Sequence, residues 1–130
     1  MLASRYHERF KGDFVSLVEH LRRQFAYDEW ANGEVLSAIR AVGGADQRSL
    51  DLMAHILSAE LLWLERLKQL PQSSPVWPKA ALEQCEAQAA EIGRMWREYL
   101  GRVTEDDLTK AVSYKNSKGE PWTSRMPLPE

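Results

Sequence analysis

The sequence has little cysteine and no long hydrophobic run. Cys85 is the one cysteine among 130 residues, so the chain cannot form an internal disulfide, which is typical of a reducing compartment. The longest uninterrupted apolar run covers residues 61–64, far short of the roughly 20 residues that a membrane-spanning helix needs. Arg5, Glu8 and Arg9 interrupt the N-terminus, where a secretory signal would be apolar. We therefore expect a cytoplasmic protein with no membrane partner.

A basic stripe is also missing from the sequence. The formal net charge is −2, and both signs are interspersed along the chain. Because nucleic-acid-binding proteins neutralise phosphates with a basic face, we expect no nucleic-acid partner. The apolar share of 44% and the charged share of 28% are ordinary for a globular protein, and the five tryptophans are not typical of a disordered one. The length predicts one domain over residues 1–130.

Three long segments place apolar residues three and four positions apart, which predicts helices. The first covers about residues 13–42 and ends at Gly43, since glycine accepts the left-handed conformation that closes helices. The second follows a predicted N-cap at Ser49 and ends before Pro71. The third covers about residues 81–103. These segments predict an all-α fold of long antiparallel helices packed side by side, because short connections favour antiparallel neighbours.

A smaller element is predicted after the third helix. Thr104 and Asp107 have the spacing of a capping box, which favours one short helical turn. Residues 112–114 then alternate in polarity as in a strand, residues 116–119 are typical of a turn, and Trp122 falls on a returning strand. We expect a small β-hairpin near the C-terminus.

The three histidines do not form an obvious metal motif. No two of them stand at the i, i+4 spacing that places two imidazoles on one helical face. We expect His7 and His20 to be solvated surface residues. His55 stands in an apolar run, and two interpretations stay open: a hydrogen-bonded core histidine or a metal ligand, since imidazole serves both roles.

Two polar residues, Asp28 and Asn32, interrupt the apolar stripe of the first helix one turn apart. An inward-facing carboxylate or amide must find partners or stay hydrated. Either they bond to a neighbouring helix where the stripe curves away, or they line a polar cavity. By contrast, Cys85 continues the apolar stripe of the third helix, which favours a small buried hydrophobe over a reactive thiol.

The tryptophans are interpreted as packing residues. Those within the helices, at positions 30, 63 and 96, are expected to be core or groove aromatics. Trp77 lies in the proline-rich connection between the second and third helices, and we expect it to pack under that loop rather than wall a pocket.

Three motifs in series resemble the DinB-like (DinB/YfiT) family of metalloenzymes. Residues 27–32 (YDEWAN) resemble its first-helix signature. Residues 55–60 (HILSAE), followed by Trp63, resemble its second-helix motif. Residues 112–119, with the pattern V-x-Y-x-N-x-x-G, resemble the hairpin before its last helix. The resemblance covers roughly residues 14–130, in the family's order.

The resemblance implies a four-helix bundle in up-down-down-up order and a divalent metal, nickel or zinc, held by three histidines. His55 stands at the position of the first ligand, on the second helix. The other two belong to a His-x-x-x-His pair on the family's fourth helix. That helix would begin at about residues 127–130, where the sequence stops. We therefore expect a domain without its last helix and a metal site that is incomplete in this chain.

Two functions follow from the resemblance. The first is a metal-dependent enzyme, such as a thiol-dependent S-transferase acting on a small-molecule thiol, in which the metal lowers the pKa of a bound water or thiol. Asp28 and Asn32 would then line the site or orient a ligand, and no catalytic residue is assigned. The alternative is a non-catalytic helical module, a homodimer that buries the groove left by the absent helix.

Overall fold

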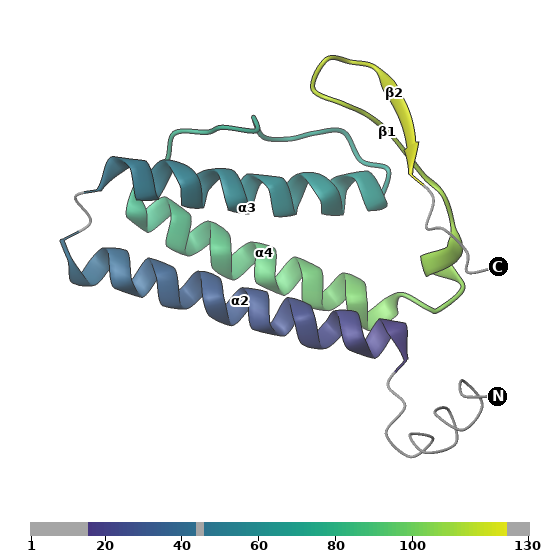
Figure 1. Cartoon of the computed structure of the whole chain (residues 1–130), viewed down its shortest axis with the longest axis horizontal. Helices are drawn as coiled ribbons and strands as arrows, with labels where there is room; N and C mark the ends of the chain where they lie inside the picture. Colours follow the sequence, from purple (N-terminus) through teal and green to yellow (C-terminus); the bar gives the residue numbers. More distant parts are fainter. Residues whose placement is uncertain (1–15, 44–45, 125–130) are drawn as a thin grey trace, which may run out of the picture.

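The computed structural model describes residues 16–43 and 46–124, and they form three long helices followed by a β-hairpin (Figure 1). The elements in chain order are α2 (Leu17–Ala41), α3 (Gln47–Leu67), α4 (Leu82–Arg102), the 3₁₀ turn η1 (Asp107–Thr109), β1 (Val112–Lys115) and β2 (Pro121–Ser124). The predicted helical class and the predicted hairpin are confirmed. Residues 13–15 of the first predicted helix, and the residues after 124, lie outside the described part of the chain.

The ends of the helices follow local hydrogen bonds. Gly43 stops α2 as predicted, with a left-handed φ of 85°. The predicted N-cap of α3 at Ser49 is wrong, because Asp46 caps this helix by accepting from the backbone N–H of Arg48 at 3.1 Å. Ser49 lies in the first turn and donates its hydroxyl to Asp46 at 2.6 Å. A carboxylate is the stronger acceptor for the exposed N–H groups at a helix start, so the helix begins two residues before Ser49.

The short connections predicted that all neighbouring helices would be antiparallel. This prediction is wrong for one pair. Figure 1 shows α2 running opposite to α3 and α4, while α3 and α4 run in the same direction. Residues 68–81, the crossing loop, return along α3 to the start of α4. This connection is long enough to cover the length of a helix, which removes the reason to expect an antiparallel pair. α2 packs chiefly on α4, and α3 also packs on α4.

The core lies among the three helices. Leu57, Leu64 and Cys85 are fully buried, which confirms the interpretation of Cys85 as a small buried hydrophobe. Trp96 is buried as predicted, whereas Trp30 is 57% exposed. Trp63 is 42% exposed, so of the three helix tryptophans, which were expected to be core or groove aromatics, only Trp96 lies in the core.

Two buried polar residues of α3 hold the crossing loop. The hydroxyl of Ser58 donates to the carbonyl of Pro75 at 2.9 Å and lies 3.0 Å from the hydroxyl of Ser74. The carboxylate of Glu65 accepts from the backbone N–H of Ser73 at 3.3 Å. These bonds satisfy polar groups that would otherwise be costly to bury.

The segment after α4 confirms the predicted capping box and hairpin. Thr104 N–H donates to the Asp107 carboxylate at 2.9 Å, and Asp107 N–H donates to the Thr104 hydroxyl at 3.3 Å. In the antiparallel sheet, Tyr114 of β1 lies opposite Trp122 of β2. The guanidinium of Arg66 lies 4.3 Å from the ring centre of Tyr114, and this cation–π contact attaches the hairpin to α3.

Candidate functional site

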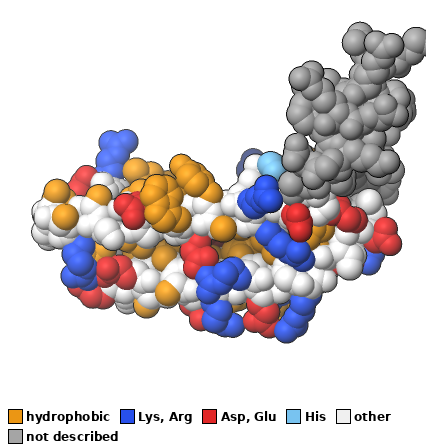
Figure 2. All heavy atoms as spheres, turned by 90° about the horizontal axis from the view of Figure 1, so that it is seen from below, with side chains coloured by type: hydrophobic (Ala, Val, Ile, Leu, Met, Phe, Trp, Pro, Cys, Tyr) orange, Lys and Arg blue, Asp and Glu red, His pale blue; other side chains and the backbone are white. Residues whose placement is uncertain are grey.

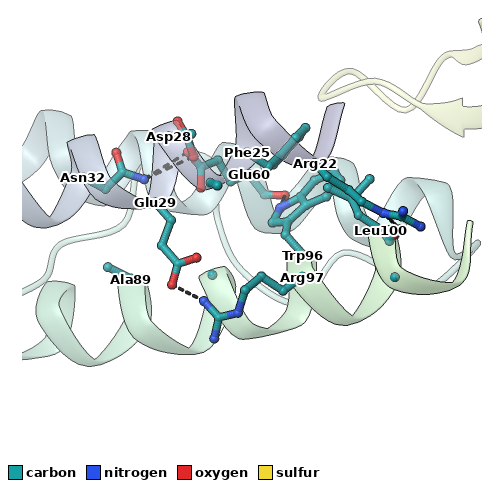
Figure 3. Close-up of a pocket in the computed structure, with 13 residues that line it drawn as sticks. Arg22, Phe25, Asp28, Glu29, Asn32, Glu60, Ala89, Trp96, Arg97 and Leu100 are labelled. Carbon is teal, nitrogen blue, oxygen red and sulfur yellow. Dashed lines mark hydrogen bonds and ion pairs between the residues drawn. The ribbon is translucent and has the colours of Figure 1, made fainter. Parts of the chain in front are cut away.

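A cavity of about 260 Å³ opens between α2 and α4 and reaches α3 (Figure 3). Its aromatic wall is formed by Phe25 and Trp96, whose stacked rings have centroids 4.2 Å apart. The indole N–H of Trp96 donates to the backbone carbonyl of Glu60 at 3.2 Å, which fixes the orientation of the ring. The cavity therefore has a rigid apolar wall, contributed by two helices and tied to the third.

A polar trio lies at one end of this cavity. The side-chain amide of Asn32 donates to Glu60 Oε1 at 3.1 Å and to Asp28 Oδ2 at 3.4 Å (Figure 3). Both interpretations left open for Asp28 and Asn32 apply, because Asn32 bonds to a neighbouring helix and both residues line the cavity. We call Asp28, Asn32 and Glu60 the polar trio.

The polar trio favours a protonated acid at Glu60. The pKa of Glu60 is raised to about 8, chiefly by burial and also by a hydrogen bond with Asp28 and the negative charge of Asp28, while the hydrogen bond from Asn32 opposes the shift. At neutral pH Glu60 therefore holds its proton.

The charged groups around the rest of the cavity already have partners. Arg97 of α4 is hydrogen-bonded and ion-paired with Glu29 of α2 (Figure 3). Gly93 makes room for this pair, because a Cβ at position 93 would lie only 2.7 Å from Glu29 Cδ. Arg22 Nε donates to the carbonyl of Leu100 at 2.7 Å. These contacts tie α2 to α4 along the cavity.

His55 is not among the residues that line this cavity. Its Nδ1 lies 2.7 Å from the carbonyl oxygen of Val76, in the crossing loop. Because a carbonyl oxygen only accepts, Nδ1 carries the proton, and in the neutral ring Nε2 holds the lone pair. The imidazole also stacks on Trp77, with centroids 3.7 Å apart and planes 5° from parallel. Trp77 thus packs one face of its ring on His55 of α3, but it is 60% exposed and lines a surface hollow with Leu52. The expectation that it packs under the loop rather than walls a pocket is therefore wrong in its second part.

The described residues do not by themselves fit a divalent metal ion. Residues 16–43 and 46–124 contain no group of three or more His, Cys, Asp and Glu side chains placed to hold a metal. His20 is exposed on α2, and His7 lies outside the described residues. A divalent ion is usually held by at least three protein ligands, and His55 would supply only one of them.

Sequence reasoning missed Glu60 as a site residue. A signal was present, because Glu60 is the one charged residue between Leu57 and Leu64, where the run is otherwise mostly apolar. Arg22, Arg97 and Gly93 carried no comparable signal, since their roles depend on how α2 packs on α4.

Two exposed apolar stripes form a second feature. Along α2 and its C-cap residue Val42, the side chains of Leu17, Val35 and Val42 are 39%, 46% and 72% exposed. On α3 those of Leu52, Ile56 and Trp63 are 44%, 41% and 42% exposed. The members of each stripe recur at heptad-related positions, so each set lies on one side of its helix. The hydrogen bond between Asn32 and Glu60 joins α2 to α3. Val35 comes three residues after Asn32, and Ile56 comes four residues before Glu60, so both stripes pass close to this bond. Figure 2 shows hydrophobic side chains at the surface among charged ones.

Comparisons with protein-family models, with curated proteins and with solved structures returned no match to this chain. Of the helices that the structure describes, none combines the length and the apolar composition needed to cross a membrane.

Proposed function

We propose that this chain is a helical association module of the DinB-like type, which works as a homodimer through the apolar stripes of α2 and α3. The observation that carries the proposal is the exposure of the six stripe residues, each between 39% and 72% exposed, on two adjoining helices. Scattered single hydrophobic residues are normal on a protein surface, but aligned sets on neighbouring elements mark an association surface.

The arrangement of the helices supports this surface as a helix-binding face. α2, α3 and α4 follow the order up-down-down, which is the order of the first three helices in the up-down-down-up bundle that the resemblance implies. α2 and α3 both pack on α4 but contact each other little. In the proposed dimer the stripes of α2 and α3 pack against the same stripes of the partner chain. Such an interface is isologous, the commonest kind in homodimers.

Charged substitutions within the stripes test the proposal. Val35→Glu and Ile56→Glu each place a carboxylate at the proposed interface, where it would be desolvated without a partner. We expect each to weaken dimerisation at least about tenfold, measured by light scattering on a size-exclusion column over a concentration series. Leu70→Glu is the matched control, since Leu70 is 53% exposed in the crossing loop and outside both stripes. An unchanged dimer in both stripe variants would refute the proposed interface.

Divalent-metal binding at His55 is the second candidate, favoured by the bond between Nδ1 and the Val76 carbonyl. Metal-ligating histidines almost always donate their other ring N–H to such an acceptor, which fixes the tautomer and orients Nε2. In this proposal His55 is one ligand of a nickel or zinc site whose remaining donors lie outside the described residues. The thiol-dependent S-transfer implied by the resemblance stays a prediction that depends on this site.

Titration of the chain with zinc chloride, followed by calorimetry, tests the second candidate. We expect His55→Ala to weaken zinc binding at least about tenfold, because it removes a first ligand, and His20→Ala to leave it unchanged. Equal affinity of His55→Ala and the unmodified chain would exclude His55 as a ligand. The two candidates are tested by different variants, since Val35→Glu leaves His55 in place and His55→Ala changes no stripe residue.

A further inference from the structure

The cavity between α2 and α4 is not used by either proposed function. None of the six stripe residues lines it, and neither does His55. A larger hollow of about 650 Å³ lies between the end of α4 and β1, but its charged groups Asp107 and Lys110 are already paired at 3.0 Å. The smaller cavity differs because two of its acidic groups, Asp28 and Glu60, form no ion pair within residues 16–43 and 46–124.

The charges of the polar trio are uncompensated within the described residues. None of the ion pairs formed by residues 16–43 and 46–124 includes Asp28 or Glu60. Apart from the hydrogen bond between Glu60 and Asp28 themselves, the side-chain bonds of these two carboxyl groups come from the neutral amide of Asn32. The cations nearest in the lining are engaged elsewhere, Arg97 with Glu29 and Arg22 with the Leu100 carbonyl. A positive group entering the cavity would therefore meet two carboxyl groups with which neither of these arginines is paired.

The remainder of the cavity suits an apolar body. Phe25 and Trp96 form its aromatic wall, and Ala89 and Leu100 add to the apolar lining. Its volume of about 260 Å³ exceeds the roughly 150 Å³ of an engineered cavity that holds benzene, and it falls below the roughly 300–1,000 Å³ typical of drug-sized ligands. An aromatic face also attracts a cation, so the wall and the carboxyl groups favour the same ligand.

We propose that this cavity binds a small organic cation, a protonated amine on an apolar body about the size of one ring. The ammonium group donates hydrogen bonds to Asp28 and Glu60, and the apolar body lies against Phe25 and Trp96. Asn32 holds the two carboxyl groups in position by donating its side-chain N–H groups to them. A carboxylate ligand is excluded from the same position by the charge of Asp28.

Binding displaces a proton in this scheme. Before binding, the pKa of Glu60, raised to about 8 chiefly by burial, keeps this acid protonated at pH 7. The ammonium replaces that proton as the group that offsets the repulsion between Glu60 and Asp28. The complex therefore forms with the release of about one proton per ligand at pH 7.

Calorimetric titration of the full chain with benzylamine at pH 7 tests the proposal. We expect saturable binding at one site, and binding of benzyl alcohol, the neutral analogue, at least about tenfold weaker. Asp28→Asn and Glu60→Gln are each expected to weaken benzylamine binding at least about tenfold. Glu34→Gln makes the same chemical change at an exposed position of α2 and should leave the affinity unchanged. No binding of benzylamine, or equal binding of both ligands, overturns the proposal.

Proton release gives a readout that needs no variant. Titrations in phosphate and in Tris differ in buffer ionisation heat, so the dependence of the binding heat on the buffer counts the protons released. We expect about one per ligand, whereas a ligand that lies only against the aromatic wall would release none and would overturn the proposal. If Glu60→Gln fails to fold, Asp28→Asn and this proton count still decide. Benzylamine binding that is unchanged in Val35→Glu and in His55→Ala would show that the cavity binds its ligand independently of the dimer interface and of the metal site.

Discussion

The side-chain amide of Asn32 on α2 donates a hydrogen bond to the carboxyl group of Glu60 on α3, at 3.1 Å. The same amide also reaches Asp28 Oδ2 at 3.4 Å. Two acidic groups thus share one neutral donor at a place where α2 and α3 otherwise contact each other little. The bond from Asn32 opposes the rise in the pKa of Glu60, but burial and the neighbouring Asp28 outweigh it and raise this pKa to about 8.

The stability of the chain should therefore carry a pH-dependent contribution from Glu60. The pKa of Glu60 rises from 4.5 to about 8 on folding, chiefly through burial. Between these values the folded chain holds a proton that the unfolded chain releases, so the contribution of Glu60 to stability falls as pH rises from about 5 to 8. One proton sets an upper limit of about 1.4 kcal/mol per pH unit, and partial exposure makes the slope smaller.

Glu60→Gln measures that contribution, because glutamine resembles the protonated acid and does not titrate. The unfolding free energy of the unmodified chain minus that of Glu60→Gln should decrease from pH 5 to pH 8, measured by urea denaturation at each pH. The difference in unfolding free energy between the unmodified chain and Glu34→Gln should not change over this pH range. A difference for Glu60→Gln that is independent of pH would show that Glu60 titrates normally in the folded chain.

His55 should stabilise the crossing loop whether or not it binds a metal. His55→Ala removes the bond to Val76 and the stack on Trp77, and we expect the unfolding free energy to fall by about 1–2.5 kcal/mol. Tryptic cleavage after Lys79 should also become faster. His55→Phe keeps an aromatic ring for the stack and should lose less. His20→Ala, at an exposed position, should change stability by less than about 0.5 kcal/mol, and a loss as large as that of His55→Ala would argue against this role.

Two glycines within helices should respond differently to alanine. A Cβ added at Gly33 would meet no other atom within 4 Å, so Gly33→Ala should stabilise α2 by about 0.5–1 kcal/mol. At Gly93 the new Cβ would lie 2.7 Å from Glu29 Cδ and would displace Glu29 from its pair with Arg97. Gly93→Ala should therefore gain less than Gly33→Ala in chemical denaturation. An equal gain at both positions would mean that the Glu29–Arg97 pair contributes nothing measurable.

The sequence was most informative where the signal is local. The glycine after α2 and the reciprocal spacing of Thr104 and Asp107 act within a few residues, and both predictions are confirmed. The start of α3 was predicted wrongly because Asp46 and Ser49 are both good capping residues and composition alone does not rank them. The parallel course of α3 and α4 depends on the path of the crossing loop, which no periodicity specifies.

The candidate site was predictable only in part. Asp28 and Asn32 were identifiable because they interrupt an apolar stripe, but their partner Glu60 comes from another helix, and its pairing depends on the packing of α2 against α3. The exposure of Trp30 was missed for a related reason. Periodicity places residues on a face of a helix but does not say which faces are covered by neighbours.

The central claim, that the stripes of α2 and α3 form a dimer interface, is tested most directly by sedimentation equilibrium of the unmodified chain at micromolar concentrations. The account predicts a concentration-dependent mass that approaches twice the 14.9 kDa of one chain. A mass of 14.9 kDa throughout the series, for a chain that unfolds cooperatively, would contradict it.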